Sequence, residues 1–432
     1  MKHILFLLIV FISFSTYAQL GGVRLGDPFP PEAGDRFYLQ EDHFVLAVKA
    51  DKKTVAIQKF DLRTHHEASL FRYKDLLPGF CVEALEKVGD RYYVFYSVRD
   101  KGSGLVGLLA REIDFKTGQF IGETRDVVAV ENAASWLLTE KGYNEGGIRR
   151  YFGVKTSANG NHIGVVWMRK KEKKSSKIIT YGGLTMDQNL KEEWRKTLDK
   201  ASIPHEDWIT SFNVDNTGWI QAAIRFKVDA QPDYKIETHI WDTKSGNLTK
   251  IFDVQQCIHS DFFDVDGGTI LVSPYLDDKR EYTSGLLVTI FEEDGKMGET
   301  HTFKFPNNLN LPNGIGERMG KELAAVKVHE DNDAVWIVAE ENYSDMPLGG
   351  ALEKPGPSAT GSSIATNYSK DILIMKIDRE LSMEWAKRIR KSQKHAGDAL
   401  NLSHWSNLHD GELQIVVNDH KENKDPKPDA NP

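Results

Sequence analysis

Seven short segments of alternating or continuous apolar residues recur along the chain, each directly after a turn rich in Asp, Asn or Gly. Asx and Gly residues supply the positive φ that tight hairpins need, so each turn is predicted to join two antiparallel strands. The seven strands that follow these turns are expected at Phe44–Val48, Tyr92–Val98, Ile163–Met168, Trp219–Ile224, Thr269–Val272, Ala334–Ala339 and Leu413–Val417.

The same order of elements follows the first six of these strands. A third strand ends in an Asp turn and a fourth strand comes after it, as at Ile113-Asp114 and Trp241-Asp242. Four strands per unit, at a spacing of roughly 50 to 80 residues, are typical of a β-propeller. The chain is therefore predicted to be all-β, a β-propeller of seven blades with the last one incomplete, or of six. A pair of β-sandwich domains is the competing fold. Short helices are expected only between units, at Val130–Glu140 and Gly316–Ala325.

The last unit differs from the others. Its hairpin runs through Val417 into a polar tail that contains Pro426, Pro428 and Pro432. Proline cannot donate to a sheet ladder, so the third and fourth strands of this unit are predicted to be missing. Either the seventh blade has an open edge, or the natural chain continues beyond this point.

The N-terminus has the pattern of a cleaved secretory signal. Lys2 and His3 precede an apolar run from Ile4 to Phe14, and Ala18 ends a small-residue cleavage site. The run is short for a membrane-spanning helix, which disfavours the alternative of an anchor. The predicted organisation is a signal peptide at 1–18, an N-terminal segment at 19–35, the propeller at 36–418 and a tail at 419–432. The mature protein is expected to be secreted, periplasmic or at the cell surface, without a membrane span.

Charge and cysteine content narrow the possible partners. The chain has 55 basic and 63 acidic residues, a net charge of −8, and its densest basic run is Arg169–Lys174. Nucleic acid is therefore not expected as a partner. Cys81 and Cys257 precede their hairpin turns by similar distances, in units three apart. We expect them to lie too far apart for a disulfide, which needs Cα atoms within about 7 Å.

Two kinds of turn resemble a known repeat. The Asp-x-x-Thr-Gly turn at Asp114–Gly118 and its variant at Asp242–Gly246, together with the pairs Asp187…Trp194 and Asp378…Trp385, resemble the tryptophan-docking repeats of quinoprotein-like propellers. That resemblance implies a Trp that fixes one blade to the next. Binding of pyrroloquinoline quinone is not implied, because only two units have the Trp. The chain as a whole is similar to secreted uncharacterised β-propellers of the Bacteroidota.

No local catalytic motif is present. The sequence lacks Gly-x-Ser-x-Gly and His-Glu-x-x-His, and the adjacent His65 and His66 would point in opposite directions on an extended chain. No metal or other cofactor is predicted. Propeller active sites are gathered from several blades, so an enzyme stays open.

Connection lengths indicate where a ligand would bind. Connections between second and third strands and between units are long, whereas the other turns are short. In a propeller both long sets lie on one face, where function is expected. The predicted ligand-binding residues are Tyr143, Arg149, His205, Trp208, Tyr275, Arg280, Tyr343, His395 and His404. The predicted function is a binding scaffold for a protein or a carbohydrate. The alternative is a glycan-acting hydrolase or lyase with its site in the central funnel.

Overall fold

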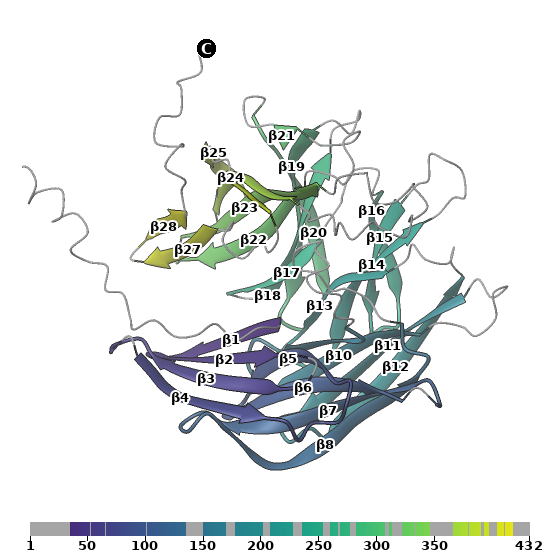
Figure 1. Cartoon of the computed structure of the whole chain (residues 1–432). Coiled ribbons are helices and arrows are strands. Elements are labelled where there is room, and N and C mark those ends of the chain that lie inside the picture. The colour runs from purple at the N-terminus through teal and green to yellow at the C-terminus, as the bar shows by residue number, and fades with distance from the viewer. Residues whose placement is uncertain are drawn as a thin grey trace, which may run out of the picture. The chain divides into compact units, whose positions relative to one another are not determined.

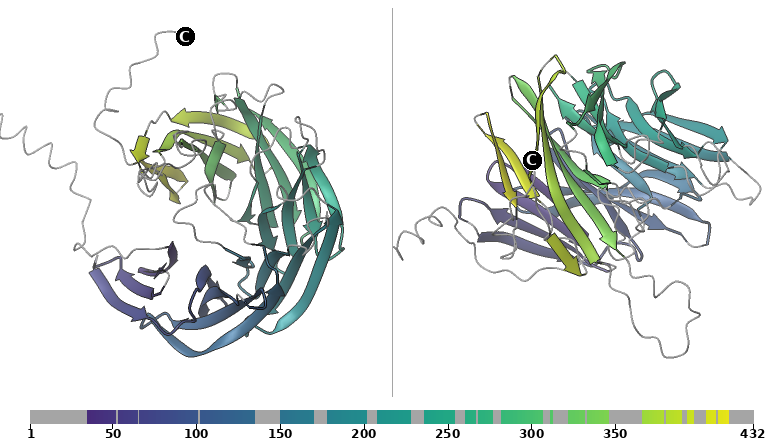
Figure 2. Two further views of the ribbon diagram at one scale, coloured as in Figure 1. Left: turned by 45° about the vertical axis from the view of Figure 1, so that its right-hand side comes forward. Right: turned by 90° about the horizontal axis from the view of Figure 1, so that it is seen from above.

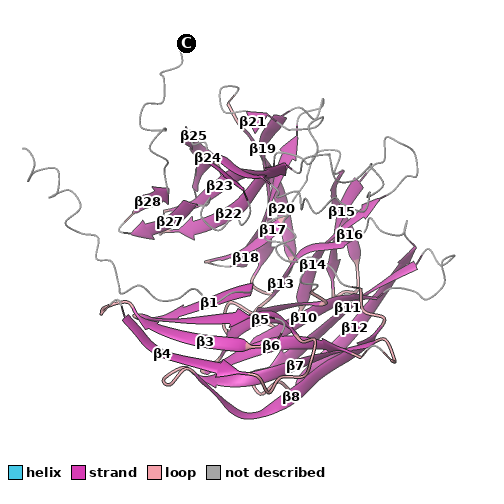
Figure 3. Ribbon diagram, viewed as in Figure 1, coloured by secondary structure: helices cyan, strands magenta, loops and turns pink. Residues whose placement is uncertain are grey.

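The computed structural model shows an all-β chain (Figures 1 and 3). It describes residues 35–51, 53–64, 66–100, 102–134, 150–169, 178–201, 208–227, 236–253, 260–266, 268–276, 282–306, 311–312, 322–331, 333–345, 366–378, 380–389, 393–396, 404–409 and 411–417. These residues form strands, turns and loops without a helix, so none of them belongs to a helix that could cross a membrane.

The strands form successive antiparallel sheets, which we call blades 1 to 7. Blade 1 contains β1 (Asp35–Glu41), β2 (Phe44–Ala50), β3 (Val55–Asp61) and β4 (His66–Tyr73). Blade 2 contains β5 (Cys81–Val88), β6 (Arg91–Arg99), β7 (Leu105–Asp114) and β8 (Gln119–Glu131). Blade 3 contains β9 (Phe152–Thr156), β10 (His162–Arg169), β11 (Ile178–Asp187) and β12 (Glu192–Ala201). Blade 4 contains β13 (Trp208–Val214), β14 (Ile220–Lys227), β15 (Ile236–Asp242) and β16 (Leu248–Asp253).

The later blades add short extra strands. Blade 5 contains β17 (Asp261–Val265), β18 (Gly268–Leu276), β19 (Tyr282–Glu292) and β20 (Met297–Lys304), with β21 (Leu311–Pro312) paired to β19. Blade 6 contains β22 (Glu322–Glu330), β23 (Ala334–Asp345), β24 (Thr366–Asp378) and β25 (Met383–Ile389), with β26 (Gln393–Ala396) paired to β24. Blade 7 has two strands among the described residues, β27 (His404–His409) and β28 (Glu412–Val417).

The chain divides into two compact units. One is Met1–Arg99 with Gly107–Val128, and the other is Asp100–Val106 with Ala129–Pro432. In the first unit β1 lies beside β5. In the second unit β9, β13, β17, β22 and β27 lie beside one another in chain order, so the first strands of successive blades are neighbours (Figure 2). Consecutive four-stranded meanders with neighbouring first strands make this a β-propeller fold, as predicted.

The second strand of each blade is the best-buried element. All seven strands predicted from apolar runs are second strands: β2, β6, β10, β14, β18, β23 and β28. In β6, every residue from Tyr92 to Ser97 is buried, because a central strand between packed sheets is covered on both faces. The described residues of blade 7 form the two strands β27 and β28, whereas the prediction that its third and fourth strands are missing concerns residues after Val417, outside the described part of the chain.

The two predicted helices are wrong wherever the structure describes them. Val130 belongs to β8, in which Val128 and Val130 are buried and Ala129 is exposed, the alternation of a strand. Leu323 lies in β22 and packs into the core between blades 5 and 6. The signal peptide, the segment 19–34, the tail 419–432 and Cys257 lie outside the described residues, so the predictions about them stand untested.

Candidate functional site

Each four-stranded blade has two unlike ends. The connections between strands one and two and between strands three and four lie at one end, which we call the turn end. The connection between strands two and three and the link to the next blade lie at the other, the loop end. In blade 2, β5 ends at Val88 and β6 begins at Arg91, so only two residues form the turn. Blade 6 has the predicted long connection at the loop end, because β23 ends at Asp345 and β24 begins only at Thr366. In blade 1, the connection from Ala50 to Val55 is as short as the turn from Asp61 to His66.

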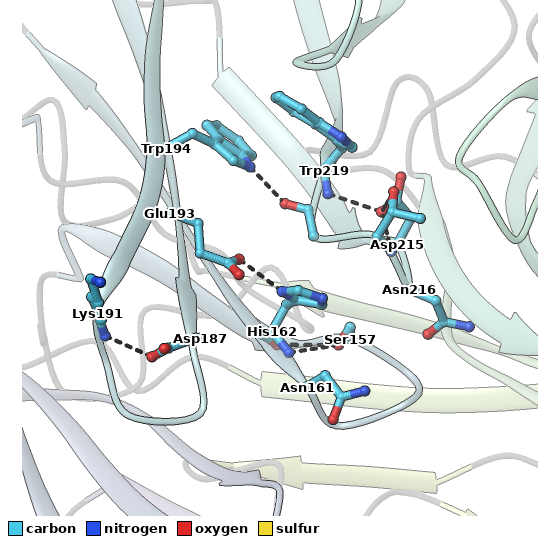
Figure 4. A network of polar contacts seen from close by, with 12 residues as sticks. Ser157, Asn161, His162, Asp187, Lys191, Glu193, Trp194, Asp215, Asn216 and Trp219 are labelled. Carbon is cyan, nitrogen blue, oxygen red and sulfur yellow. Dashed lines mark hydrogen bonds and ion pairs between the residues drawn. The ribbon is translucent and has the colours of Figure 1, made fainter.

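Aspartates organise the turns at the turn end. The Asp215 carboxylate accepts hydrogen bonds from the backbone N–H groups of Thr217 and Trp219, both at 2.9 Å (Figure 4). Asp187 does the same for Asn189 and Lys191, at 2.8 and 2.9 Å. These carboxylates satisfy turn amides that would otherwise lack partners, so the repeated Asp has a structural role.

Trp194 fixes blade 3 to blade 4. Its indole N–H donates to the carbonyl of Gly218 at 2.9 Å, and its ring stacks on Trp219 with centroids 4.9 Å apart (Figure 4). Two residues on, the Lys196 ammonium lies 4.7 Å from the Trp219 ring centroid and donates to the carbonyls of Thr243 and Lys244. The Trp docking implied by the resemblance is therefore confirmed at this position.

Polar side chains make further bonds between the turns of blades 3 and 4. The backbone N–H of Asn159 donates to the side-chain oxygen of Asn216 at 2.9 Å, and the Asn159 amide donates to the Asn216 carbonyl at 3.0 Å. Within blade 3, His162 Nδ1 lies 2.8 Å from Glu193 Oε2 (Figure 4). The turn ends of these two blades are therefore bonded to each other directly.

In the first unit, polar side chains of one blade also donate to carbonyls in a turn of the neighbouring blade. The Lys59 ammonium donates to the Lys116 carbonyl at 2.8 Å, and the Ser69 hydroxyl donates to the Thr117 carbonyl at 3.0 Å. Burial lowers the pKa of Lys59, whose ammonium also lies 3.9 Å from the Phe44 ring centroid. Gly118 has φ +77°, and a Cβ there would lie 3.0 Å from Ser69 Oγ. The Asp114–Gly118 turn thus fixes blade 2 to blade 1.

The Asp114–Gly118 turn is expected to make the stability of the protein depend on pH in the acid range. The Thr117 hydroxyl donates to Asp114 at 2.9 Å and, with backbone N–H groups, holds the pKa of that carboxyl below its usual range. The ionised Asp114 carboxylate therefore stabilises the fold fully when the pH is above the pKa of an unfolded Asp, about 3.9. This stabilisation is lost as the pH falls through the lower pKa of the folded state. We expect Thr117→Val to lower the melting temperature at pH 7, with the difference from wild type shrinking below pH ~4. Thr117→Ser, which keeps the hydroxyl, is the control, and a pH-independent difference would contradict this account.

A second polar cluster joins the first strands of blades 3, 4 and 5. The Lys155 ammonium donates to Asn213 Oδ1 at 3.2 Å and lies 3.8 Å from Asp264 Oδ2. The Asn213 amide donates to Thr269 Oγ1 at 2.9 Å, and the Thr269 hydroxyl donates to Asp264 Oδ1 at 3.3 Å. The four side chains thus form a closed ring of polar contacts, which links three blades at their turn ends.

The loop end holds the described candidates for ligand binding. Trp208 and His404 begin β13 and β27, Tyr275 and Tyr343 lie near the ends of β18 and β23, and His395 lies in β26. All five are therefore at the predicted end of their sheets, but their expected placement in loops is wrong. The strands run further than the sequence indicated, and β26 folds back to pair with β24. Tyr143, Arg149, His205 and Arg280 lie outside the described residues.

In the part of the chain that the structure describes, the loop ends of blades 5 and 6 carry the extra strands β21 and β26. The β23–β24 hairpin continues past an irregularity at Glu340/Asn342, pairing Tyr343 with Tyr368. On the other side of β24, His395 is paired with Asn367. The structure thus brings Tyr343 and His395 into one three-stranded ribbon, whereas Trp208 and His404 belong to other blades.

Tyr275 is positioned by a glycine in the neighbouring strand. It is half-buried on β18 and pairs with Gly285 of β19. A Cβ on Gly285 would lie 2.4 Å from Tyr275 Cε1 and 2.1 Å from the Phe303 carbonyl oxygen. No side chain larger than hydrogen fits there without displacing its neighbours, so Gly285 lets the Tyr275 ring lie across the sheet.

Buried carboxylates at the base of the blade 6 ribbon were missed by the sequence reasoning. Glu340, Glu341 and Asp371 are 0%, 3% and 8% exposed. The Arg388 guanidinium donates twice to Asp371 Oδ2, its Nε at 2.6 Å. Their position beside apolar runs could have indicated burial. Glu340 and Glu341 directly follow the apolar run Ala334–Ala339, and Asp371 directly precedes another apolar run. In the described part of the chain, no three His, Cys, Asp or Glu side chains are grouped so that they could hold a metal ion.

Comparison with known proteins does not assign the chain to a family. No family model matches the chain, and no curated protein matches it. Among solved structures, it is similar to the β-propeller domain of the Trilobed protease from Pyrococcus furiosus, with 10% identity, TM-score 0.36, and coverage of 84% of this chain and 95% of that one. It is also similar to the Dos1 propeller, with 10% identity, TM-score 0.40, and coverage of 69% and 62%. A third is the GH43 endo-arabinanase from Bacillus licheniformis, with 12% identity, TM-score 0.30, and coverage of 64% and 100%. The fold assignment accordingly rests on the sheet topology given above.

Proposed function

We propose that this protein is an exported binding scaffold that holds a protein or a carbohydrate at the loop ends of blades 5 and 6. This proposal rests on a difference between the turn ends and the loop ends of the sheets in the second unit. Side chains at the turn ends are engaged in bonds between blades, as with Trp194 and Lys196. The loop ends of blades 5 and 6 instead carry the additional strands β21 and β26.

The residue types at this end suit a binding role. Tyrosine offers a large, rigid, amphipathic surface, which stacks on sugar rings and anchors protein side chains at little cost in conformational entropy. Histidine and arginine add hydrogen bonds to hydroxyl and carboxylate groups. Tyr275 is half-buried, and the ribbon that contains Tyr343 and His395 gives these residues a backbone fixed by two ladders. Sites built on strands are held more firmly than sites on free loops.

Export is part of the proposal. Residues 1–18 carry the basic, apolar and small-residue regions of a secretory signal. We expect the full-length gene product in the periplasm or outside the cell, shortened by cleavage after Ala18. Cell fractionation with N-terminal sequencing measures both, and an uncleaved cytoplasmic protein would contradict this part.

The binding experiment compares the two ends of the sheets. The secreted form is screened on an array of plant and bacterial glycans and by cross-linking to extracellular proteins. For the ligand found, Tyr275→Ala and His395→Ala should each weaken binding about tenfold or more, as expected for central contacts. Asn159→Ala and Lys244→Ala, at the turn ends, are the matched controls. Loss of binding in the two controls, with unchanged binding in the first pair, would reverse the assignment of the ends.

One observation favours a second candidate, a glycan-acting hydrolase or lyase. Glu340, Glu341 and Asp371 are buried carboxylates at the base of the ribbon, and glycosidases use a pair of carboxyl groups as acid and base or nucleophile. If any glycan from the array is cleaved, Glu340→Gln and Glu341→Gln distinguish the candidates. Retained binding with at least a hundredfold loss of turnover would support the enzyme.

A further inference from the structure

The turn between β9 and β10 contains a chemically reactive dipeptide, Asn159-Gly160. Asparagine before glycine is prone to deamidation, because glycine has no Cβ to hinder its backbone nitrogen from approaching the asparagine side chain. Asn159 is exposed and Gly160 is half-buried, so water reaches the turn. The other Asn-Gly pair of the sequence, Asn313-Gly314, lies outside the described residues.

The turn itself holds both reacting groups in hydrogen bonds. The backbone N–H of Gly160 donates to the Ser157 carbonyl at 2.8 Å, so removing its proton breaks that bond. Asn159 Oδ1 accepts from the Ser157 hydroxyl at 2.8 Å and from the Asn161 backbone N–H at 3.0 Å. These bonds fix the orientation of the side-chain amide.

Blade 4 holds the same asparagine from outside the turn. Asn159 Nδ2 donates to the Asn216 carbonyl at 3.0 Å, and the Asn159 backbone N–H donates to Asn216 Oδ1 at 2.9 Å. Nδ2 is the atom that leaves as ammonia in deamidation. The reaction therefore has to break a bond between blades 3 and 4.

We propose that Asn159 is a latent deamidation site, held unreactive by its bonds to Asn216, and that its deamidation loosens the junction of blades 3 and 4. The Gly160 nitrogen gives its proton to a base and bonds to Asn159 Cγ, while the Cγ–Nδ2 bond breaks and ammonia leaves with a proton. Water then opens the resulting five-membered imide at either carbonyl, which gives aspartate or isoaspartate. The net change is one water taken up and one ammonia released.

The product cannot remake the contact with blade 4. A carboxylate has no N–H to donate to the Asn216 carbonyl, so two acceptors then face each other. Isoaspartate also adds a carbon to the backbone directly before Gly160, whose φ of +72° shapes the turn. The junction keeps the bond from Trp194 to the Gly218 carbonyl but loses its bond from the Asn159 side chain.

Peptide mapping by mass spectrometry measures the rate of deamidation at Asn159 in the full chain. The reference is a synthetic peptide of residues 155–163, in which no neighbouring blade holds the pair. At mildly alkaline pH we expect the folded chain to react at least about tenfold more slowly than the peptide, because its hydrogen bonds must break first. Equal rates in the two would overturn the proposal.

Two variants of Asn216 test the part played by blade 4. Asn216→Ala removes the oxygen that accepts from the Asn159 backbone and should raise the rate in the folded chain about threefold or more. Asn216→Asp keeps an oxygen at that position and is the matched control, with a rate close to that of wild type. Equal rates in both variants and wild type would assign the protection to the turn alone and contradict the proposal.

The effect on the junction is tested with Asn159→Asp, which is the aspartate product itself. Hydrogen exchange, resolved by peptide, should be faster at 158–161 and 215–218 in this variant than in wild type, because the two turns lose a shared bond. The turn at 243–246, which Lys196 holds, is the internal control and should not change. Unchanged exchange at 158–161 and 215–218 would show that deamidation leaves the junction intact.

Discussion

Replacing Arg388 with alanine should destabilise the second unit by about 3 to 5 kcal/mol. Arg388 places two N–H donors on one oxygen of Asp371, a residue that is 8% exposed. Removing the guanidinium leaves a buried carboxylate without its cation, and the desolvation penalty of that charge is no longer offset. Urea denaturation of the variant, followed by tryptophan fluorescence, measures the loss.

A double-mutant cycle identifies the cause. Asp371→Asn removes the charge that Arg388 compensates, so Arg388→Ala should cost much less in that background. Lys387→Ala, one residue away on the exposed side of β25, is the matched control and should change stability by less than about 0.5 kcal/mol. A similarly small effect of Arg388→Ala would mean that the pair does not support the base of the ribbon.

Replacing Trp194 with alanine should cost about 3 kcal/mol, because the residue joins blades 3 and 4 by three kinds of contact. It stacks on Trp219, donates to the Gly218 carbonyl, and packs with Leu198 against the core of blade 4. The indole hydrogen bond alone is worth about 1 kcal/mol, and the stacked aromatic pair adds a comparable amount.

Trp385 provides the matched comparison for Trp194. It occupies the same register in blade 6, but its ring meets Trp336 of its own blade at 5.5 Å, edge-on. Trp385→Ala should therefore cost at least 1 kcal/mol less than Trp194→Ala in thermal or urea unfolding. Equal losses would show that docking onto the next blade adds nothing to the stability that Trp194 provides.

Local patterns were enough to predict the blades. The second strands are apolar on both faces and follow Asx or Gly turns, so β2, β6 and β10 could be read from short windows. The Asp114–Gly118 turn was also readable, because the Asp114 carboxylate accepts hydrogen bonds from the Lys116 backbone N–H and the Thr117 hydroxyl, two and three residues away. The docking of Trp194 was implied by the resemblance of the Asp187…Trp194 pair to tryptophan-docking repeats.

Features that depend on distant contacts were not predicted. Tyr275 and Tyr343 were expected in loops, because polar residues near Pro274 and Glu341 hide the continuation of two long hairpins. That continuation depends on pairing with β19 and β24, which no local window shows. The burial of Glu340 and Asp371 depends on the folded sheet in the same way. Leu323 seemed helical for the same reason, although the core between blades 5 and 6 makes it part of a strand.

We expect ligand to be held at the loop ends of the second unit, while the turn ends hold the blades together. Hydrogen exchange with and without the identified ligand, resolved by peptide, distinguishes the two ends. The account predicts slower exchange on binding in 270–276, 340–345, 366–371 and 393–396, with no change at the turns 158–161, 215–218 and 243–246. Ligand protection confined to those turns would contradict it.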